Sequence, residues 1–448
     1  MFNTIDELRK EFPALAQEFY GKPLVYLDNA ATSQKPLSVI ELMDRMTRLT
    51  NSNVHRAMYR LSDEVTSLYE RARDVVVKFI NAPGRENIIF TSGTTASINL
   101  VARSLADAPC GELSEKYSCV GNRCSVNGKF LGKGDVIVFT GDSHHSNLVP
   151  WQLAALRTGA EIEYTRLDKD GCWSITQLDS LLAQIVESGR RVRLVAITHI
   201  SNVLGIINPV KAAVKVAHKY GALALVDGAQ GIVHEKVDVI DFNCDFYAFS
   251  AHKIYGQTGV GVLYGKKEIL EAMPAFMGGG DMVDRVSYEK TTYAPLPLKF
   301  EAGTPNFIGA ASLAPALEFA MLLRKDEMAL EIERNEKAIK EYLQKEFSGI
   351  EGVQWYGNAP LQKRIALYSI TVQGCHPADM AQILDKMGIA VRTGLLCAEP
   401  VMNHFGVGVN SGSNTPQGML RVSFAPYNTL AEAEYFITSL KRCIGMLR

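Results

Sequence analysis

Apolar and polar positions along the chain follow two alternating patterns, one typical of strands and the other typical of helices. Short apolar runs of the strand type occupy residues 88–90, 135–140, 194–198, 222–227 and 246–249. Stretches with helical spacing lie between them, at 146–158 and 210–220, and another follows the small polar residues 91–95 and continues to about 105. Strands that alternate with helices in this way predict an α/β fold around a mostly parallel, mixed sheet.

This alternation stops near residues 295–297, where Pro, Leu and Pro follow one another. Beyond this point the pattern predicts helices at 313–323 and 327–346 and strands at 366–372 and 420–424. Such a mixture is typical of a smaller α+β domain. We therefore expect a large domain over 22–296 and a small domain built from 1–21 and 297–448.

The beginning of the chain has an amphipathic pattern. Phe2, Ile5, Leu8 and Phe12 recur at helical spacing, so we expect the first 20 residues to be helical. The next predicted elements are a strand at 24–28, a helix at 36–49, an irregular segment at 51–59 and a helix at 64–80. Two long loops are expected, at 106–134 and 403–418.

Composition narrows the class of protein. The chain has 448 residues, of which 47% are hydrophobic and 21% charged, an ordinary soluble balance. A net charge of -1 gives no bulk attraction for nucleic acid. No apolar run approaches the roughly 18 residues of a membrane span, and the first residues do not resemble a signal peptide. Eight cysteines without a CxxC pair indicate a reducing, cytoplasmic setting rather than a disulfide framework.

Polar residues follow five of the predicted strands. They are Thr94 and Thr95, then His144 and His145, then His199 and Asn202, then Asp227 and Gln230, and finally Ser250, His252 and Lys253. Any one of them has an ordinary structural explanation, such as a helix cap, a turn or a hydrogen-bonded core histidine. Because parallel strands place their carboxyl ends at one edge, we expect all five groups to lie together there, where open α/β sheets bind ligands.

Lys253 is the most unusual of these residues. It follows a buried strand and precedes glycines at 256, 259 and 261, which permit a tight backbone. A surface lysine with a buried stem is the alternative interpretation. The whole set, however, fits pyridoxal 5′-phosphate (PLP): an acid for the pyridine nitrogen, a histidine to stack on the ring, hydroxyl groups at a helix N-terminus for the phosphate, and a lysine for a Schiff base.

Nine ordered motifs carry a resemblance to a known family. They read LDNAATSQKP, VHRAMYRLS, TSGTTASINLVA, HHSNLVPWQ, AITHISNVLG, VDGAQ, FYAFSAHKIYGQTGVGVLYG, FEAGTPN and AVRTGLLCAEP. In this order they resemble the SufS-type (group II) cysteine desulfurases, of the class V aminotransferase group of fold-type I PLP enzymes. The resemblance implies an aspartate aminotransferase-like PLP domain with a smaller domain, in a homodimer whose sites lie at the interface.

The resemblance also assigns cofactor roles to individual residues. Lys253 is implied to be the Schiff-base lysine, and His144 to stack on the ring. The other cofactor-binding positions implied are Asp227 at the pyridine nitrogen, Gln230 at the ring hydroxyl, Asn202 beside His144, and Thr94, Thr95, Ser250 and His252 at the phosphate, with Thr304 supplied by the other subunit. Arg421 and Arg392, together with Asn202, are implied to hold the substrate carboxylate, a task that suits the planar fork of a guanidinium.

Cys397 is implied to be the catalytic nucleophile, because it alone follows the RTGxxCA pattern. In this family the cysteine thiolate attacks the sulfur of L-cysteine, which leaves a persulfide and releases alanine. The sulfur then passes to an acceptor protein of the SufE or SufU kind for iron–sulfur cluster assembly. A selenocysteine lyase or cysteine sulfinate desulfinase on the same site is the alternative activity.

The sequence departs from the family pattern in four places, one of which is the loop at 403–418, longer than is usual in the family. Leu395 and Leu396 stand where histidines are common, and Ser143 stands where an acid is expected. The segment 106–134 looks like an insertion whose Cys110, Cys119 and Cys124 match no standard zinc spacing, so we expect no metal site.

A nucleotide-binding loop at GQTGVG is disfavoured, since it lacks the following lysine. A scaffold without catalysis is disfavoured because every cofactor position is present.

Overall fold

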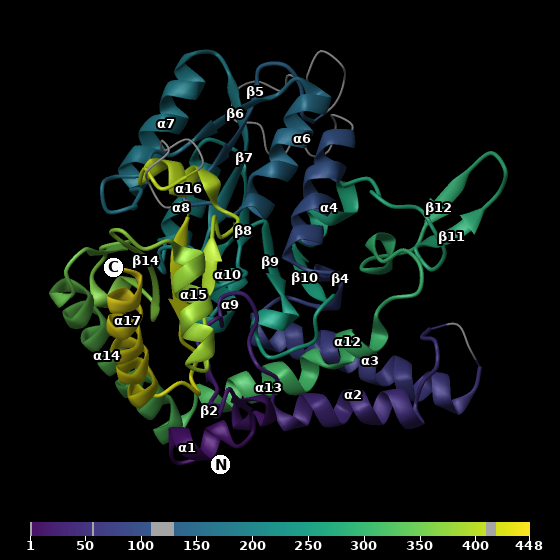
Figure 1. Cartoon of the computed structure of the whole chain (residues 1–448). Coiled ribbons are helices and arrows are strands. Elements are labelled where there is room, and N and C mark those ends of the chain that lie inside the picture. The colour runs from purple at the N-terminus through teal and green to yellow at the C-terminus, as the bar shows by residue number, and fades with distance from the viewer. Residues whose placement is uncertain (1, 56–57, 109–129, 409–417) are drawn as a thin grey trace.

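The computed structural model describes residues 2–55, 58–108, 130–408 and 418–448. A seven-stranded sheet forms its centre (Figure 1). The strand order is β4 (Ile88–Thr91), β10 (Gly261–Gly265), β9 (Phe246–Ser250), β8 (Leu223–Asp227), β7 (Arg191–Thr198), β5 (Asp135–Phe139) and β6 (Glu161–Tyr164). Strand β10 pairs antiparallel with both neighbours, and the other pairings are parallel. The predicted α/β class with a mostly parallel, mixed sheet is confirmed.

Helices cover both faces of this sheet because its strands are apolar on both sides. In β7, Val195 and Ile197 belong to one core cluster, whereas Leu194 and Ala196 belong to the other. One face packs on α2 (Leu37–Leu49), α3 (Arg60–Phe79), α7 (Ile175–Glu187), α8 (Val210–Lys219), α12 (Phe307–Ala311) and α13 (Leu313–Leu323). The other face packs on α4 (Thr94–Asp107), α6 (Val149–Thr158) and α11 (Lys267–Ala272).

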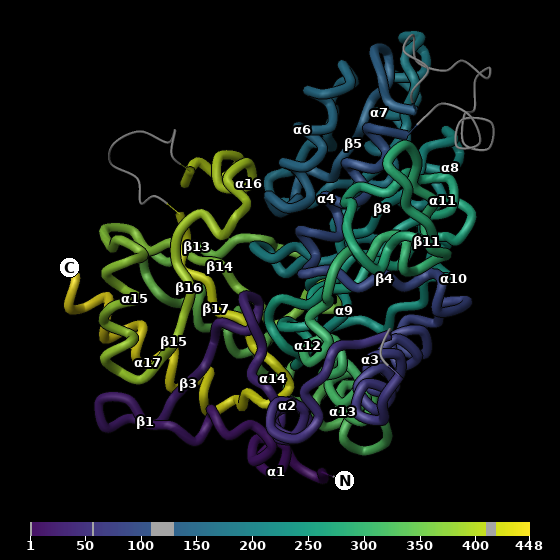
Figure 2. Tube along the Cα trace, turned by 90° about the vertical axis from the view of Figure 1, so that its right-hand side faces the viewer, coloured from purple at the N-terminus to yellow at the C-terminus, as the bar shows by residue number. Residues whose placement is uncertain are grey.

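A second sheet is entirely antiparallel. Its order is β13 (Val353–Tyr356), β14 (Leu367–Val372), β17 (Met419–Ser423) and β16 (Arg392–Gly394). Its core includes side chains of α14 (Asp326–Gly349), α15 (Pro377–Lys386) and α17 (Leu430–Leu447). Figure 2 shows this part beside the large sheet, with the N-terminal segment along the bottom of the view. The boundary at 296/297 stays a prediction; α13, which follows it, packs on α3.

The N-terminal segment is less helical than expected. Only α1 (Ile5–Arg9) is α-helical, and a 3₁₀ turn (Pro13–Ala16) follows it. Pro13 lacks the N–H that a continuing helix needs. Ile5, Leu8 and Phe12 are nevertheless buried, as the pattern predicted. After the turn come β1 (Glu18–Phe19), β2 (Lys22–Pro23) and β3 (Val25–Tyr26), and β3 pairs with β15 (Ile389–Ala390).

Several elements were not predicted from the sequence. The strands β11 (Val283–Val286) and β12 (Thr291–Tyr293) form a hairpin that projects from the molecule (Figure 1). The helices that were not predicted include α7, α15 and α17 and the short helices α9 (Gly231–His234), α10 (Val239–Phe242) and α16 (Glu399–His404). Most of the two predicted loops, at 109–129 and 409–417, lies outside the described residues.

Within the described part of the chain, no single helix is long and apolar enough to cross a bilayer. The stretch 307–323 reaches that length and apolar content only together with 326–349, from which it is bent by 79°.

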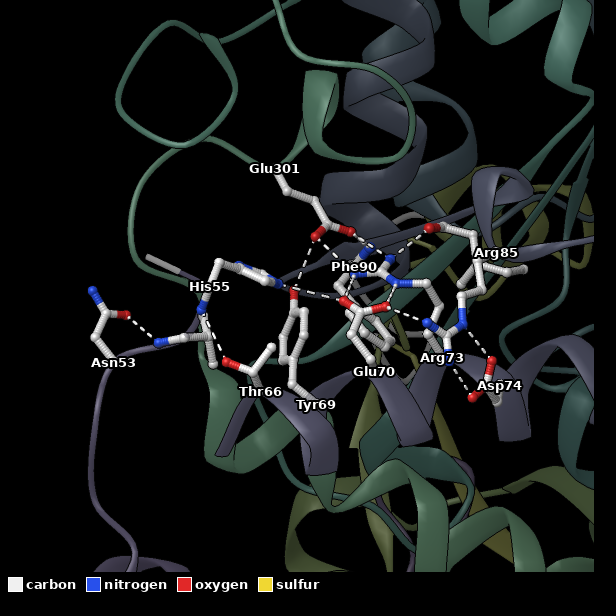
Figure 3. A network of polar contacts seen from close by, with 12 residues as sticks. Asn53, His55, Thr66, Tyr69, Glu70, Arg73, Asp74, Arg85, Phe90 and Glu301 are labelled. Carbon is white, nitrogen blue, oxygen red and sulfur yellow. Dashed lines mark hydrogen bonds and ion pairs between the residues drawn. The ribbon is translucent and has the colours of Figure 1, made fainter. Parts of the chain in front are cut away.

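A buried ion pair closes the open edge of the large sheet at β4 (Figure 3). The Glu301 carboxylate accepts from the Phe90 N–H at 2.7 Å, and Arg73 donates to the Ile88 carbonyl at 2.6 Å. Arg73 also donates twice to Glu301, at 2.8 and 3.0 Å, and its side chain is fully buried. The pair thus supplies the backbone partners that a further strand would have supplied.

The same network continues to the surface. Glu70 accepts from Arg73 and lies 3.4 Å from His55 Nε2. Although burial alone would raise it, these contacts with His55 and Arg73 hold the pKa of Glu70 at about 2. Tyr69 donates to Glu301 at 2.9 Å. The network therefore joins α3 and β4 to the segment that follows Glu301.

Replacement of Arg73 by methionine is expected to destabilise the protein by about 3–5 kcal/mol, because it leaves a buried carboxylate without its charge partner. Urea denaturation followed by tryptophan fluorescence measures this change. The control is Arg71→Met, since Arg71 makes an exposed pair with Glu318 and should contribute no more than about 1 kcal/mol. Equal effects of the two substitutions would contradict the role assigned to the buried pair.

Candidate active site

A cavity of about 330 Å³ lies at the carboxyl ends of the large sheet's strands, where the second sheet meets them. Nearly all of the site residues predicted from the sequence line it: Thr94, Thr95, His144, Asn202, Asp227, Gln230, Ser250, His252, Lys253, Arg392, Cys397 and Arg421. The predicted convergence of strand ends at one edge is therefore confirmed. What each residue does there is a separate question.

Thr304 is the predicted residue that does not line this cavity. It lies in the segment after Glu301, where its hydroxyl is 3.5 Å from Asn53 Nδ2. The sequence resemblance placed Thr304 in the site of the other subunit, and that remains a prediction.

Hydroxyl groups surround the first turn of α4. The Thr94 N–H donates to Ser250 Oγ at 2.8 Å, and the two hydroxyl groups of these residues are also 2.8 Å apart. Thr95 Oγ1 lies 2.7 Å from Ser146 Oγ. Gly93, at φ +153°, precedes the helix, and a side chain at Gly261 would collide with it. A 14-residue helix that begins among hydroxyl groups is suited to bind an anion such as a phosphate.

An acid and a lysine occupy the middle of the cavity. Asp227 is buried, which raises the pKa of its carboxyl group, while the Ala229 N–H donates to Oδ1 at 3.0 Å. Burial lowers the pKa of Lys253 from 10.5 to about 8; Asp227 opposes this shift and Arg421 adds to it. A lysine with this pKa is partly neutral near physiological pH, so it can act as a nucleophile or a base.

His144 is held neutral. Burial, followed by the nearby charge of Lys253, lowers its pKa to about 3. Its Nδ1 accepts from the Ser146 N–H at 3.0 Å, so the ring carries its proton on Nε2. A neutral imidazole can lie against an aromatic ligand without adding charge to the cavity.

Two arginines share one carboxylate that the sequence analysis did not identify. Asp28 lies 3.1 Å from Arg421 NH2 through Oδ1 and 2.8 Å from Arg392 NH2 through Oδ2. Arg421 is buried and also donates to the Asn202 carbonyl at 3.0 Å. Its buried Nε has no hydrogen-bond partner among the described residues, so a donor remains for a ligand carboxylate.

The polar contacts that sequence reasoning missed include Ser146, which lines the cavity, and Asp28, which pairs with two of the arginines that line it. Asp28 belongs to the LDNAATSQKP motif, and its position at the end of a short strand was the available signal. Ser146 follows His144 in the HHSNLVPWQ motif. Gln230, by contrast, was identified, but its amide nitrogen donates to the Ala30 carbonyl at 2.7 Å.

Cys397 brings a thiol to this cavity from the loop after β16. It is exposed, and its neighbour Leu396 is held by Asn202, which donates to the Leu396 carbonyl at 2.8 Å. This accessible thiol lines the same cavity as Lys253 and Arg421. The cavity thus combines an amine, an acid, an anion cup and a thiol.

Comparisons with known proteins agree on one group. The family described as Aminotransferase class-V matches residues 25–120 and 114–436. The chain is 43% identical to a protein named "Probable cysteine desulfurase" from Halalkalibacterium halodurans, over 97% of each chain. It is 40% identical to a "Cysteine desulfurase" from Pectobacterium carotovorum, over the full length of both.

Solved structures give the same result. The apo cysteine desulfurase from Thermococcus onnurineus superimposes with a TM-score of 0.85 at 33% identity, over the whole of both chains. The cysteine desulfurase CsdA from Escherichia coli superimposes with a TM-score of 0.82 at 35% identity, also over the whole of both chains.

The pH dependence of Lys253 tests the electrostatics of the cavity. In protein freed of any bound aldehyde, a reagent that modifies neutral amines should react with Lys253 at half of the maximal rate near pH 8. Asp227→Asn should move this midpoint to lower pH, because the carboxylate favours the charged ammonium. Peptide mass spectrometry at each pH measures both values, with the exposed Lys211 as an internal control. A midpoint of 10 or above would contradict the assignment.

Proposed function

The chain belongs to the aminotransferase class V family, and on this premise we propose that it is a PLP-dependent cysteine desulfurase. The observation that carries the proposal is one cavity lined by both Lys253 and Cys397. The lysine suits a cofactor with an aldehyde group, and the thiol suits a sulfur transfer. Relatives that bear this name over the full length of the chain support the same conclusion.

The cavity fits PLP by the chemistry of its donor groups. Thr94, Thr95, Ser250 and His252 would hold the phosphate, while Asp227, Gln230, His144 and Asn202 would hold the ring. The hydroxyl cup at the α4 N-terminus and the buried acid, which line the same cavity, support this arrangement. When bound through Lys253, PLP supplies an electron sink for bonds at the substrate's α- and β-carbons.

The substrate, L-cysteine, would be oriented by its carboxylate. Arg421 offers its buried Nε, and Arg392 stands at the more exposed side of the cavity. Asp28 keeps both guanidinium groups in position and balances part of their charge. The Lys253 amine, with a pKa of about 8, would take the α-proton and later return a proton. His144 would remain neutral throughout.

Cys397 would then accept the sulfur. Its thiolate forms a bond to the substrate's sulfur, while the bond between that sulfur and the substrate's β-carbon breaks. The electron pair of the broken bond stays with the carbon skeleton, which takes up a proton and leaves as alanine. The enzyme keeps a persulfide on Cys397. A thiol is required because sulfur can both accept a sulfur atom and release it again.

The later steps and the assembly are also part of the proposal. We propose that the persulfide passes to a SufE- or SufU-like acceptor protein for iron–sulfur cluster assembly, in the reducing cytoplasm that keeps thiols free. We propose a homodimer in which the partner subunit's Thr304 completes the phosphate cup. The position of this residue outside the cavity of its own chain supports that arrangement.

Persulfide formation distinguishes Cys397 from the other thiols. After reaction with L-cysteine, the peptide that contains Cys397 should gain one sulfur atom by mass. Cys397→Ala should lower alanine formation by at least about 100-fold, because the nucleophile is lost. The control is Cys172→Ala, since burial and the carboxylates of Asp168 and Asp170 raise the pKa of that thiol to about 11.

Two outcomes would change this assignment. A sulfur atom gained only on another cysteine would contradict the role of Cys397. Selenocysteine or cysteine sulfinate turnover that survives Cys397→Ala would instead support the alternative activity on the same site, a selenocysteine lyase or cysteine sulfinate desulfinase.

Cofactor attachment is tested by Lys253→Ala. The purified wild-type protein should show the visible absorption of lysine-bound PLP, and the variant should lose it because no other lysine among the described residues lines the cavity. Lys211→Ala, which changes an exposed lysine, should leave the spectrum unchanged. An unchanged spectrum in Lys253→Ala would contradict the proposed attachment.

A further inference from the structure

The loop that carries Cys397 is held in an unusual backbone conformation. Leu396 and Cys397 are consecutive residues with positive φ angles, 51° and 54°. Residues other than glycine seldom adopt this left-handed region, because their Cβ comes too close to the following carbonyl oxygen. Such a pair persists only where surrounding contacts hold it, and strain of this kind is concentrated at functional sites.

His145 makes two contacts with the backbone directly after the thiol-bearing Cα of Cys397. Its backbone N–H donates to the Cys397 carbonyl at 2.7 Å, and its Nε2 accepts from the Glu399 N–H at 3.0 Å. The chain therefore arches from residue 397 to residue 399 with both ends attached to one histidine. Asn202 holds the preceding carbonyl, on Leu396. Leu396 and Ala398 are buried on either side, which leaves the Cys397 side chain as the exposed one.

The turn that contains His145 also contacts the remainder of the site. His144 lines the cavity immediately before it, and Ser146 meets Thr95 of the anion cup immediately after it. The turn is a short 3₁₀ helix (His145–Asn147), and Asn147 accepts from the Trp151 indole N–H at 3.2 Å. Three consecutive residues thus connect the cavity, the cysteine loop and the cup through one short element.

We propose that His145 is a positioning residue for Cys397, an inference that rests on the proposed function for its catalytic consequence. It fixes the strained arch so that the thiol stays directed at the substrate's sulfur. It does not line the cavity, so it does not hold cofactor or substrate. Its side chain acts as a hydrogen-bond acceptor for a backbone N–H, a task that requires an unprotonated Nε2.

The test compares a variant that keeps this acceptor with variants that remove it. In His145→Gln, the amide oxygen can replace Nε2, whereas His145→Leu and His145→Ala leave the Glu399 N–H without its partner. The control is His404→Leu, because His404 lies on the same helix as Glu399 and contacts the Asp168 carbonyl instead. All variants are prepared as holoenzymes.

Hydrogen–deuterium exchange at the amides of residues 396–399 reports the arch directly. Exchange at Glu399 should become at least about tenfold faster in His145→Leu and His145→Ala, and should stay within threefold of the wild type in His145→Gln and His404→Leu. In the same variants, kcat for alanine formation should fall about tenfold without the acceptor, while KM for L-cysteine and PLP content stay within twofold.

The results separate this inference from the function itself. Wild-type exchange and wild-type kcat in both acceptor-free variants would overturn the role of His145. Two other results would overturn it in favour of a merely structural role. One is a loss of kcat that is matched by an equal loss of bound PLP. The other is a loss of kcat in His145→Gln as large as in the acceptor-free variants. A wild-type enzyme that forms no alanine from L-cysteine would instead refute the proposed function, and the exchange comparison would still test the arch.

Discussion

Charge balance in a largely buried cavity is the constraint on which the remaining structure depends. Lys253 and Arg421 bring two cations to one small space, and such charges are costly to bury without partners. The carboxylate of Asp227 balances the charge of Lys253, and the carboxylate of Asp28 balances the charge of Arg421. The four groups come from distant parts of the chain, so the charges can be balanced only after both sheets and the segment between them are in position.

The segment at residues 27–33 makes that assembly possible. The Ser423 N–H donates to the Leu27 carbonyl at 2.8 Å, and Asn29 Nδ2 donates to the Ser423 carbonyl at 2.7 Å, so the segment is joined to the second sheet. At its other end, the Ser33 N–H donates to the His252 carbonyl at 3.0 Å, next to Lys253. One short stretch therefore contacts the residue before Lys253 on one side and, through Asp28, Arg421 on the other. The site is a property of the two sheets together.

The sequence predicted the features that depend on the periodicity of apolar residues and on the direction of the strands in the sheet. Helix 313–323 was placed at its observed bounds, and the strand ends met where parallel strands must meet. The missed features depend on contacts that have no local signature. Asp28 and Arg421 are in contact although 393 positions separate them in the sequence, and 254 positions separate His145 from Glu399. Strand β6 was overlooked because its edge position leaves it partly exposed, and Pro13 ended a helix whose amphipathic spacing suggested otherwise.

The ion pair at β4 has a consequence beyond its own stability. An open edge strand offers unpaired N–H and carbonyl groups to any extended peptide, including an identical strand of another molecule, and so invites aggregation. Here Arg73 and Glu301 occupy the groups of Phe90 and Ile88 on that edge with side chains. A guanidinium and a carboxylate cannot propagate a ladder as a strand would. At β4 the folded sheet is thus ended by side-chain groups that a second copy of the chain cannot extend.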